Sequence, residues 1–178
     1  MMDAFEELGL ERRLVMSADD VRQAFREAGK HRHPDAGGTA ADFETLQKAS
    51  EILTHPSTRL RHWLELEQIP GEMRGPVGSV VMDQFAAIGP VLQEADKVVR
   101  EKNAAGSLLA KALLEGRVQE VRERIEAVQE QLEAERIRLE ESFSAVESGA
   151  EDGWRVAREL AFLGKWSAQL KERFAALW

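Results

Sequence analysis

The 178-residue sequence predicts an all-α protein, and three observations support this fold class. Tyrosine is absent, β-branched residues are sparse, and no alternating apolar run is bounded by hairpin-turn residues, so no strand is predicted. Apolar residues recur instead at helical spacing over most of the chain. Two prolines and three glycines fall between residues 69 and 79, which predicts a linker there. We therefore expect two helical domains, at 1–68 and 80–178.

The first domain is predicted to be an antiparallel pair of helices, each about 15 residues long, with short helices at either end. Ser17 followed by Asp20 is a capping signal for the first long helix, which must end before Pro34. After a glycine turn, Thr39 and Asp42 repeat the capping signal for the second long helix.

The second domain is predicted to contain three helices. The first covers residues 80–103 and is expected to be broken or kinked at Gly89 and Pro90. The second lies within 107–147 and carries a heptad-like apolar seam, interrupted at Glu135, whose members are Val118, Val121, Ile125, Val128, Leu132 and Leu139. A third helix follows a turn at 149–153. The result is a three-helix bundle or coiled-coil hairpin, and a monomer is favoured over a dimer.

Composition narrows the classes of function. The formal net charge of −8 argues against nucleic-acid or membrane-surface partners, since both are anionic. No apolar run is long enough to span a bilayer, and the acidic start is unlike a targeting peptide. These features predict a cytoplasmic protein. Cysteine is absent, which removes thiol chemistry and cysteine-ligated metals, and no cofactor is expected.

Residues 31–35 read His-Arg-His-Pro-Asp, at the end of a basic helix and before two glycines. The surrounding sequence resembles that of J-domain proteins. Phe5 and the Leu8-Gly9 pair stand where the family has its short first helix, and Phe25 precedes the motif histidine by eight residues. The next helix matches the family pattern at Phe43, Leu46, Ala49 and Leu53, and a proline turn and Arg59 follow.

The resemblance implies a co-chaperone that stimulates ATP hydrolysis by a DnaK-type chaperone. Three residues, His33, Pro34 and Asp35, would form the switch that acts on the chaperone. Another three, Arg22, Arg26 and Lys30, would form the basic face that docks on it. A positive patch on a net-acidic protein would steer encounter with an acidic partner.

Two features depart from the family pattern. The residue before the motif histidine is usually tyrosine and is Arg32 here, so one aromatic contact is replaced by a charge. The loop between Asp35 and Phe43 has only seven residues, as in some compact family members.

The order of segments resembles HscB, a co-chaperone of iron–sulfur cluster assembly. A J-domain, a short elbow and a helical bundle follow one another without a cysteine-rich or Gly/Phe-rich segment. Residues 154–166 resemble the final HscB helix, and residues 63–66 resemble the end of its J-domain. The resemblance implies an HscA-type chaperone and the iron–sulfur scaffold protein as partners.

The client site implied by this resemblance is apolar and is formed by Val81, Met82, Phe85 and Phe162. The family's acidic continuation is missing, because residues 86–90 contain no acid. Packing in the core is an alternative role for the same side chains. A different client, or self-assembly through the helical hairpin, is the alternative function.

No catalytic site and no metal site are predicted. His31 and His33 diverge on a helix and lack a third ligand. His33 and Asp35 alone do not make an active site, so the protein is not expected to be an enzyme. His55 and His62 are expected in a turn and on a helix surface.

Overall fold

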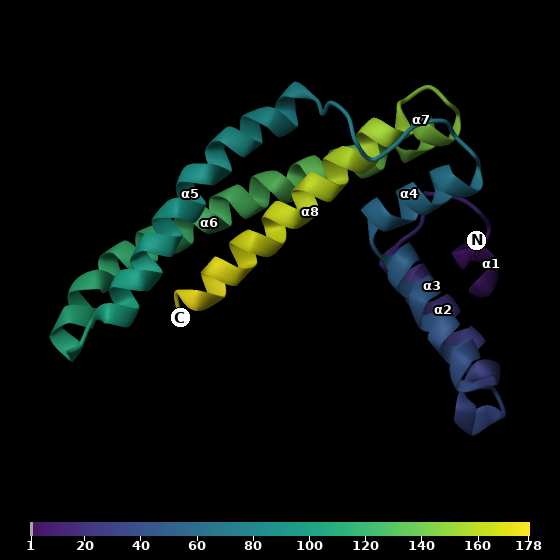
Figure 1. Cartoon of the computed structure of the whole chain (residues 1–178), viewed down its shortest axis with the longest axis horizontal. Helices are drawn as coiled ribbons and strands as arrows, with labels where there is room; N and C mark the ends of the chain where they lie inside the picture. Colours follow the sequence, from purple (N-terminus) through teal and green to yellow (C-terminus); the bar gives the residue numbers. More distant parts are fainter. Residues whose placement is uncertain (1) are drawn as a thin grey trace. The chain divides into compact units, whose positions relative to one another are not determined.

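The computed structural model describes residues 2–178, apart from the side chain of Ala36, and contains only helices and loops among them (Figure 1). The all-α fold class is therefore confirmed. In chain order the elements are α1 (Ala4–Glu7), α2 (Ala18–Arg32), the 3-10 turn η1 (Pro34–Ala36), α3 (Ala40–Thr54), α4 (Pro56–Leu66), α5 (Ser79–Ala104), α6 (Leu108–Glu141), α7 (Phe143–Glu147) and α8 (Gly153–Ala176).

The chain forms two compact units. The first contains the chain up to Gly75 together with Leu139–Arg158, and the second contains Pro76–Arg138 and Glu159–Trp178. This grouping assigns residues 139–158 to the N-terminal unit, whereas the sequence places them in the second domain. The division at 1–68, 69–79 and 80–178 stays a prediction. Within the described part of the chain, no helix is both long and apolar enough to cross a membrane.

Both predicted capping boxes are confirmed. The Ser17 hydroxyl accepts from the Asp20 amide while the Asp20 carboxylate accepts from the Ser17 amide, and Thr39 and Asp42 repeat the arrangement. Helix α2 ends at Arg32 because His33, which precedes a proline, adopts extended backbone. These local signals place the predicted switch between the two long helices of the first unit.

The core of the first unit is formed by α1, the α2–α3 hairpin and α4. Buried apolar side chains include Phe5, Leu14, Val21, Leu46, Leu53, Leu60 and Leu64. His62 is also buried, which corrects the expectation of a surface position. Its Nε2 accepts a hydrogen bond from the Ala4 amide at 3.0 Å, and its ring stacks on Phe5. Docking of α1 therefore depends on α4.

Residues 139–158 attach to the first unit through specific contacts. The buried Arg59 guanidinium donates to the Leu53 carbonyl at 2.9 Å and lies over the Phe143 ring at 5.8 Å. Burial lowers the pKa of Arg59 to about 10, so it remains charged at neutral pH. The Leu14 amide donates to the Glu147 carboxylate. These contacts explain why the segment belongs to this unit.

In the second unit, the predicted seam of α6 is largely buried, as seen at Val118, Val121, Ile125 and Leu132. Its polar interruption, Glu135, is also buried, and its carboxylate accepts two hydrogen bonds from Arg138. A coiled-coil seam tolerates such a residue when the charge is paired.

The expected break in α5 does not occur, because the helix continues from Ser79 to Ala104 through Pro90. Ile88 and Val91, which flank the Gly-Pro pair, are both buried. Their burial offsets the hydrogen bond that a proline removes from a helix interior. Arg117 of α6 forms ion pairs with Glu94 and Glu101 of α5, which joins the two helices.

Candidate functional site

The cationic face of α2 is exposed. Arg22, Arg26 and Lys30 follow one another at four-residue intervals, so they share one side of the helix. Arg22 pairs with Asp19 at 2.6 Å and Lys30 pairs with Glu27 at 2.8 Å. The hydrogen bond from Lys30 lowers the pKa of the Glu27 carboxyl. Such exposed pairs are weak and can rearrange when a partner approaches.

The three switch residues follow at the end of α2. Pro34 begins the η1 turn, and His33 Nδ1 accepts a hydrogen bond from the Asp35 amide at 3.2 Å. This bond leaves the proton of the neutral ring on Nε2. The Asp35 side chain is 93% exposed and that of His33 is 44% exposed. Both can therefore reach a partner.

Two phenylalanine rings, Phe43 and Phe25, pack in succession against the ring of His33. The His33 ring meets the Phe43 ring edge-on, with centroids 4.8 Å apart, and Phe43 contacts Phe25 at 5.9 Å. Phe43 comes from α3 and Phe25 from α2, so both helices of the hairpin fix the histidine. The sequence does not predict the contact between His33 and Phe43, although both residues match the family pattern.

The loop after the switch needs its two glycines. Gly37 has a φ of +91°, which L-residues with side chains rarely adopt. A Cβ on Gly38 would lie 2.2 Å from the Arg32 carbonyl oxygen. The Gly38 amide also donates to the His33 carbonyl at 3.1 Å. The seven-residue loop therefore folds back tightly onto the end of α2.

The docking of α1 in the first unit depends on pH through the buried His62. Burial lowers the pKa of His62 from its ordinary value, and nearby Asp3 and Glu65 oppose this effect only in part. Because Nε2 accepts from the Ala4 amide, the hydrogen bond requires an unprotonated nitrogen. The docking of α1 is therefore sensitive to acid.

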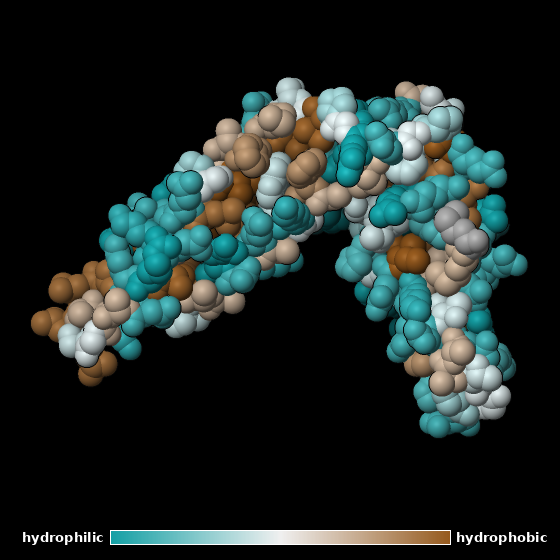
Figure 2. Space-filling model, viewed as in Figure 1, coloured by the Kyte–Doolittle hydropathy of each residue, from teal (hydrophilic) through white to brown (hydrophobic). Residues whose placement is uncertain are grey.

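The four predicted client-site residues line one groove in the second unit. Val81, Met82 and Phe85 come from α5 and Phe162 from α8, and they enclose a cavity of about 250 Å³. Val81 is buried, whereas Met82 and Phe85 are more than half exposed. Figure 2 shows hydrophobic surface over this part of α5. Large exposed apolar side chains at a groove are typical of an interaction site.

Two further residues complete the groove, and sequence reasoning missed both in this role. Val77 and Trp166 belong to its lining. The Trp166 ring lies 5.8 Å from that of Phe85 and 5.7 Å from that of Phe162. The sequence places the tryptophan in the last helix, and its four-residue spacing from Phe162 is the signal that it shares this face.

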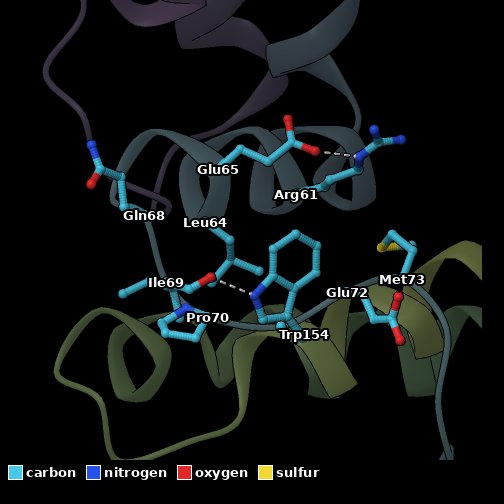
Figure 3. A pocket seen from close by; sticks show the side chains of 10 residues that line it. Arg61, Leu64, Glu65, Gln68, Ile69, Pro70, Glu72, Met73 and Trp154 are labelled. Atoms are coloured by element: carbon cyan, nitrogen blue, oxygen red, sulfur yellow. Dashed lines mark hydrogen bonds and ion pairs between the residues drawn. The ribbon is translucent and has the colours of Figure 1, made fainter.

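A second cavity, of about 550 Å³, lies in the first unit and contains none of the predicted site residues (Figure 3). Trp154 forms one wall and donates from Nε1 to the Ile69 carbonyl at 2.9 Å. Arg158 donates to the Glu72 carbonyl at 2.8 Å. The segment predicted to be a linker is thus attached to the first turns of α8 over residues 69–72.

The side chains that the structure describes include no cluster of three or more His, Asp or Glu residues that could hold a metal ion.

Comparisons with known proteins give a match in sequence and a match in structure. No protein-family model matches the chain. The rice (Oryza sativa subsp. japonica) protein described as chaperone protein dnaJ A6 is 38% identical over 55 residues, which represent 31% of this chain and 13% of that relative. The solved structure of chaperone HscB from Vibrio cholerae aligns with a TM-score of 0.57 and 20% identity over 96% of both chains.

The two matches carry different information. The HscB match covers nearly the whole chain but, at this identity, concerns the fold alone. The rice match concerns sequence, and it spans only about an eighth of that relative's length. Together they confirm the predicted resemblance: this chain is an all-α protein with an HscB-like fold and a J-domain-like segment.

Proposed function

We propose that the protein is a J-domain co-chaperone that stimulates the ATPase of a DnaK/HscA-type chaperone. One observation carries this proposal: half-exposed His33 and exposed Asp35 lie at the end of the α2–α3 hairpin, directly after a helix with an exposed cationic face. Arg22, Arg26 and Lys30 dock on an acidic surface of the chaperone. The His-Pro-Asp turn then acts on the docked chaperone.

The charges support different roles for the cationic face of α2 and for the His-Pro-Asp turn. The three cations accelerate encounter, and their contribution weakens as salt is raised. The switch is held by Phe43 and by the backbone of the glycine loop, so it is presented in one conformation. A pre-organised switch loses less entropy on binding.

The groove of the second unit presents the client. Its lining is apolar, and Met82, Phe85 and Phe162 offer side chains that a bound partner would remove from water. The iron–sulfur scaffold protein is the leading client, in line with the HscB-like fold. The absence of acids at residues 86–90 means that binding depends on the apolar contacts.

The chaperone role is tested by steady-state ATP hydrolysis. Each DnaK-type chaperone of the host is assayed alone, with the protein, and with its His33→Gln variant. Stimulation that the variant loses supports the proposal, and a response from the chaperone of iron–sulfur assembly supports the scaffold as client. If no chaperone responds at low salt, the proposed function is wrong.

The docking face is tested by reversing its charges. Replacing all three cations with glutamate is expected to raise the half-stimulating concentration at least tenfold, because attraction becomes repulsion. The maximal rate at saturation should change less. Glu44→Lys on α3, which alters an exposed charge outside this face, is the control. An unchanged half-stimulating concentration in the triple variant would remove the face from the docking site.

A second candidate function is supported by a different surface. Leu108, Leu109 and Leu113, at the start of α6, are 88%, 71% and 76% exposed. Figure 2 shows their end of the α5–α6 hairpin as a hydrophobic patch. Such a patch favours an adaptor that recruits a different client or self-assembles. Sedimentation as a 20.0 kDa monomer, together with scaffold binding, would exclude the self-assembling form.

A further inference from the structure

Arg32, at the position where J-domain proteins usually have tyrosine, forms an ion pair that a neutral tyrosine could not form. Its Nη1 donates to the Glu7 carboxylate at 2.7 Å and to the Glu7 carbonyl at 3.3 Å. The two side chains are 32% and 28% exposed, so the ion pair is partly shielded from water. It joins α1 to the last residue of α2.

The backbone carbonyl of Arg32 contacts the glycine loop that follows the switch. Gly38 packs so closely on the Arg32 carbonyl that no side chain would fit there. Thr39 lowers the pKa of the Asp42 carboxyl through hydrogen bonds, and the charge of Arg32 adds to this effect. Arg32 therefore contacts α1 through its side chain and the glycine loop through its carbonyl.

From these contacts we propose that the Glu7–Arg32 ion pair is a positioning device that fixes the His33-Pro34-Asp35 turn relative to α1 and α2. Arg32 acts through the backbone of its neighbour His33 and need not touch the chaperone. The pair replaces an aromatic contact with a charged hydrogen bond, which is more directional. This inference rests on the proposed function for its effect on ATP hydrolysis, but its structural part is independent of that function.

The structural part is tested by amide hydrogen exchange. The Gly37 and Gly38 amides donate to the Pro34 and His33 carbonyls, so their exchange reports opening of the loop. Glu7→Gln is expected to speed exchange at both glycines by about fivefold, as expected when one part-buried charged hydrogen bond is weakened. Glu44→Gln, which removes an exposed ion pair with Lys48, should leave the exchange unchanged.

The functional part is tested by stimulation of chaperone ATPase over a range of concentrations. Glu7→Gln and Arg32→Gln should lower the maximal stimulation several-fold with little change in the half-stimulating concentration, because the docking face is intact. A general loss of folding would change both values. The charge-exchanged variant, Glu7→Arg with Arg32→Glu, should recover part of the loss.

Three results would overturn the inference. The first is unchanged glycine exchange in Glu7→Gln. The second is a variant whose half-stimulating concentration alone is altered. The third is a charge-exchanged variant no better than either single variant. If the unaltered protein stimulates no chaperone while Glu7→Gln still loosens the loop, the proposed function fails and the positioning contact stands.

Discussion

The groove of the second unit leads to a prediction about Met82 and Phe85. Replacing both with alanine should abolish tight binding of the scaffold protein and leave the fold intact. Phe85 is 57% exposed, and an aromatic side chain offers about 200 Å² of surface. A partner that covers this exposed part removes about 110 Å² from water, worth about 3 kcal/mol at roughly 25 cal/mol per Å².

This magnitude converts to a measurable change in affinity. About 3 kcal/mol corresponds to roughly a hundredfold increase in Kd, to which Met82, 53% exposed, adds. The stability cost should be smaller than the roughly 3–5 kcal/mol of a fully buried Phe→Ala change, because more than half of each side chain is already in water.

The assay is isothermal titration of the scaffold protein into each variant, with urea unfolding as the test of folding. Ile137→Ala is the matched control, since Ile137 is 47% exposed on α6 and does not line the groove. The reasoning is refuted if the double variant binds within twofold of the unaltered protein. It is also refuted if Ile137→Ala weakens binding equally.

Two further predictions concern the free energy of unfolding. Gly71→Ala should lower the free energy of unfolding by about 2 kcal/mol or more, because its Cβ would lie 2.1 Å from Trp154 Cδ1 at a φ of +147°. Gly116→Ala, in an open helical position, should raise it by about 0.5–1 kcal/mol, and urea unfolding compares the two. Acid should also weaken the unit. In the unfolded chain His62 takes up its proton near the ordinary histidine pKa of 6.5, whereas in the fold burial lowers that pKa. The free energy of unfolding therefore falls as pH drops below about 6.5, and His62→Gln should reduce that fall between about pH 7.5 and pH 5.5.

Much of the first unit could be predicted because its signals are local. The capping boxes at Ser17 and Thr39 each need only a residue three positions away. The end of α2 is dictated by the proline that follows His33. Local signals of this kind do not depend on how distant segments pack.

The features that were missed depend on distant contacts. The burial of His62 requires the amide of Ala4, 58 residues away, and the ion pair of Arg32 joins it to Glu7 across 25 residues. A break of α5 at Gly89 and Pro90, one of the two outcomes expected from the sequence, does not occur, because burial of the flanking residues outweighs the helix-breaking tendency of proline. Local preference cannot report burial of this kind.

The central claim is that the His-Pro-Asp turn of this chain triggers a DnaK-type chaperone. Hydrolysis of chaperone-bound ATP in a single turnover tests it most directly, with His33→Gln compared against His31→Gln. His31 is an exposed histidine on the last turn of α2, two residues before His33, so the two variants differ in position rather than in chemistry. The account predicts that His33→Gln loses the acceleration and His31→Gln keeps most of it. Equal acceleration by both variants and the unaltered protein would contradict it.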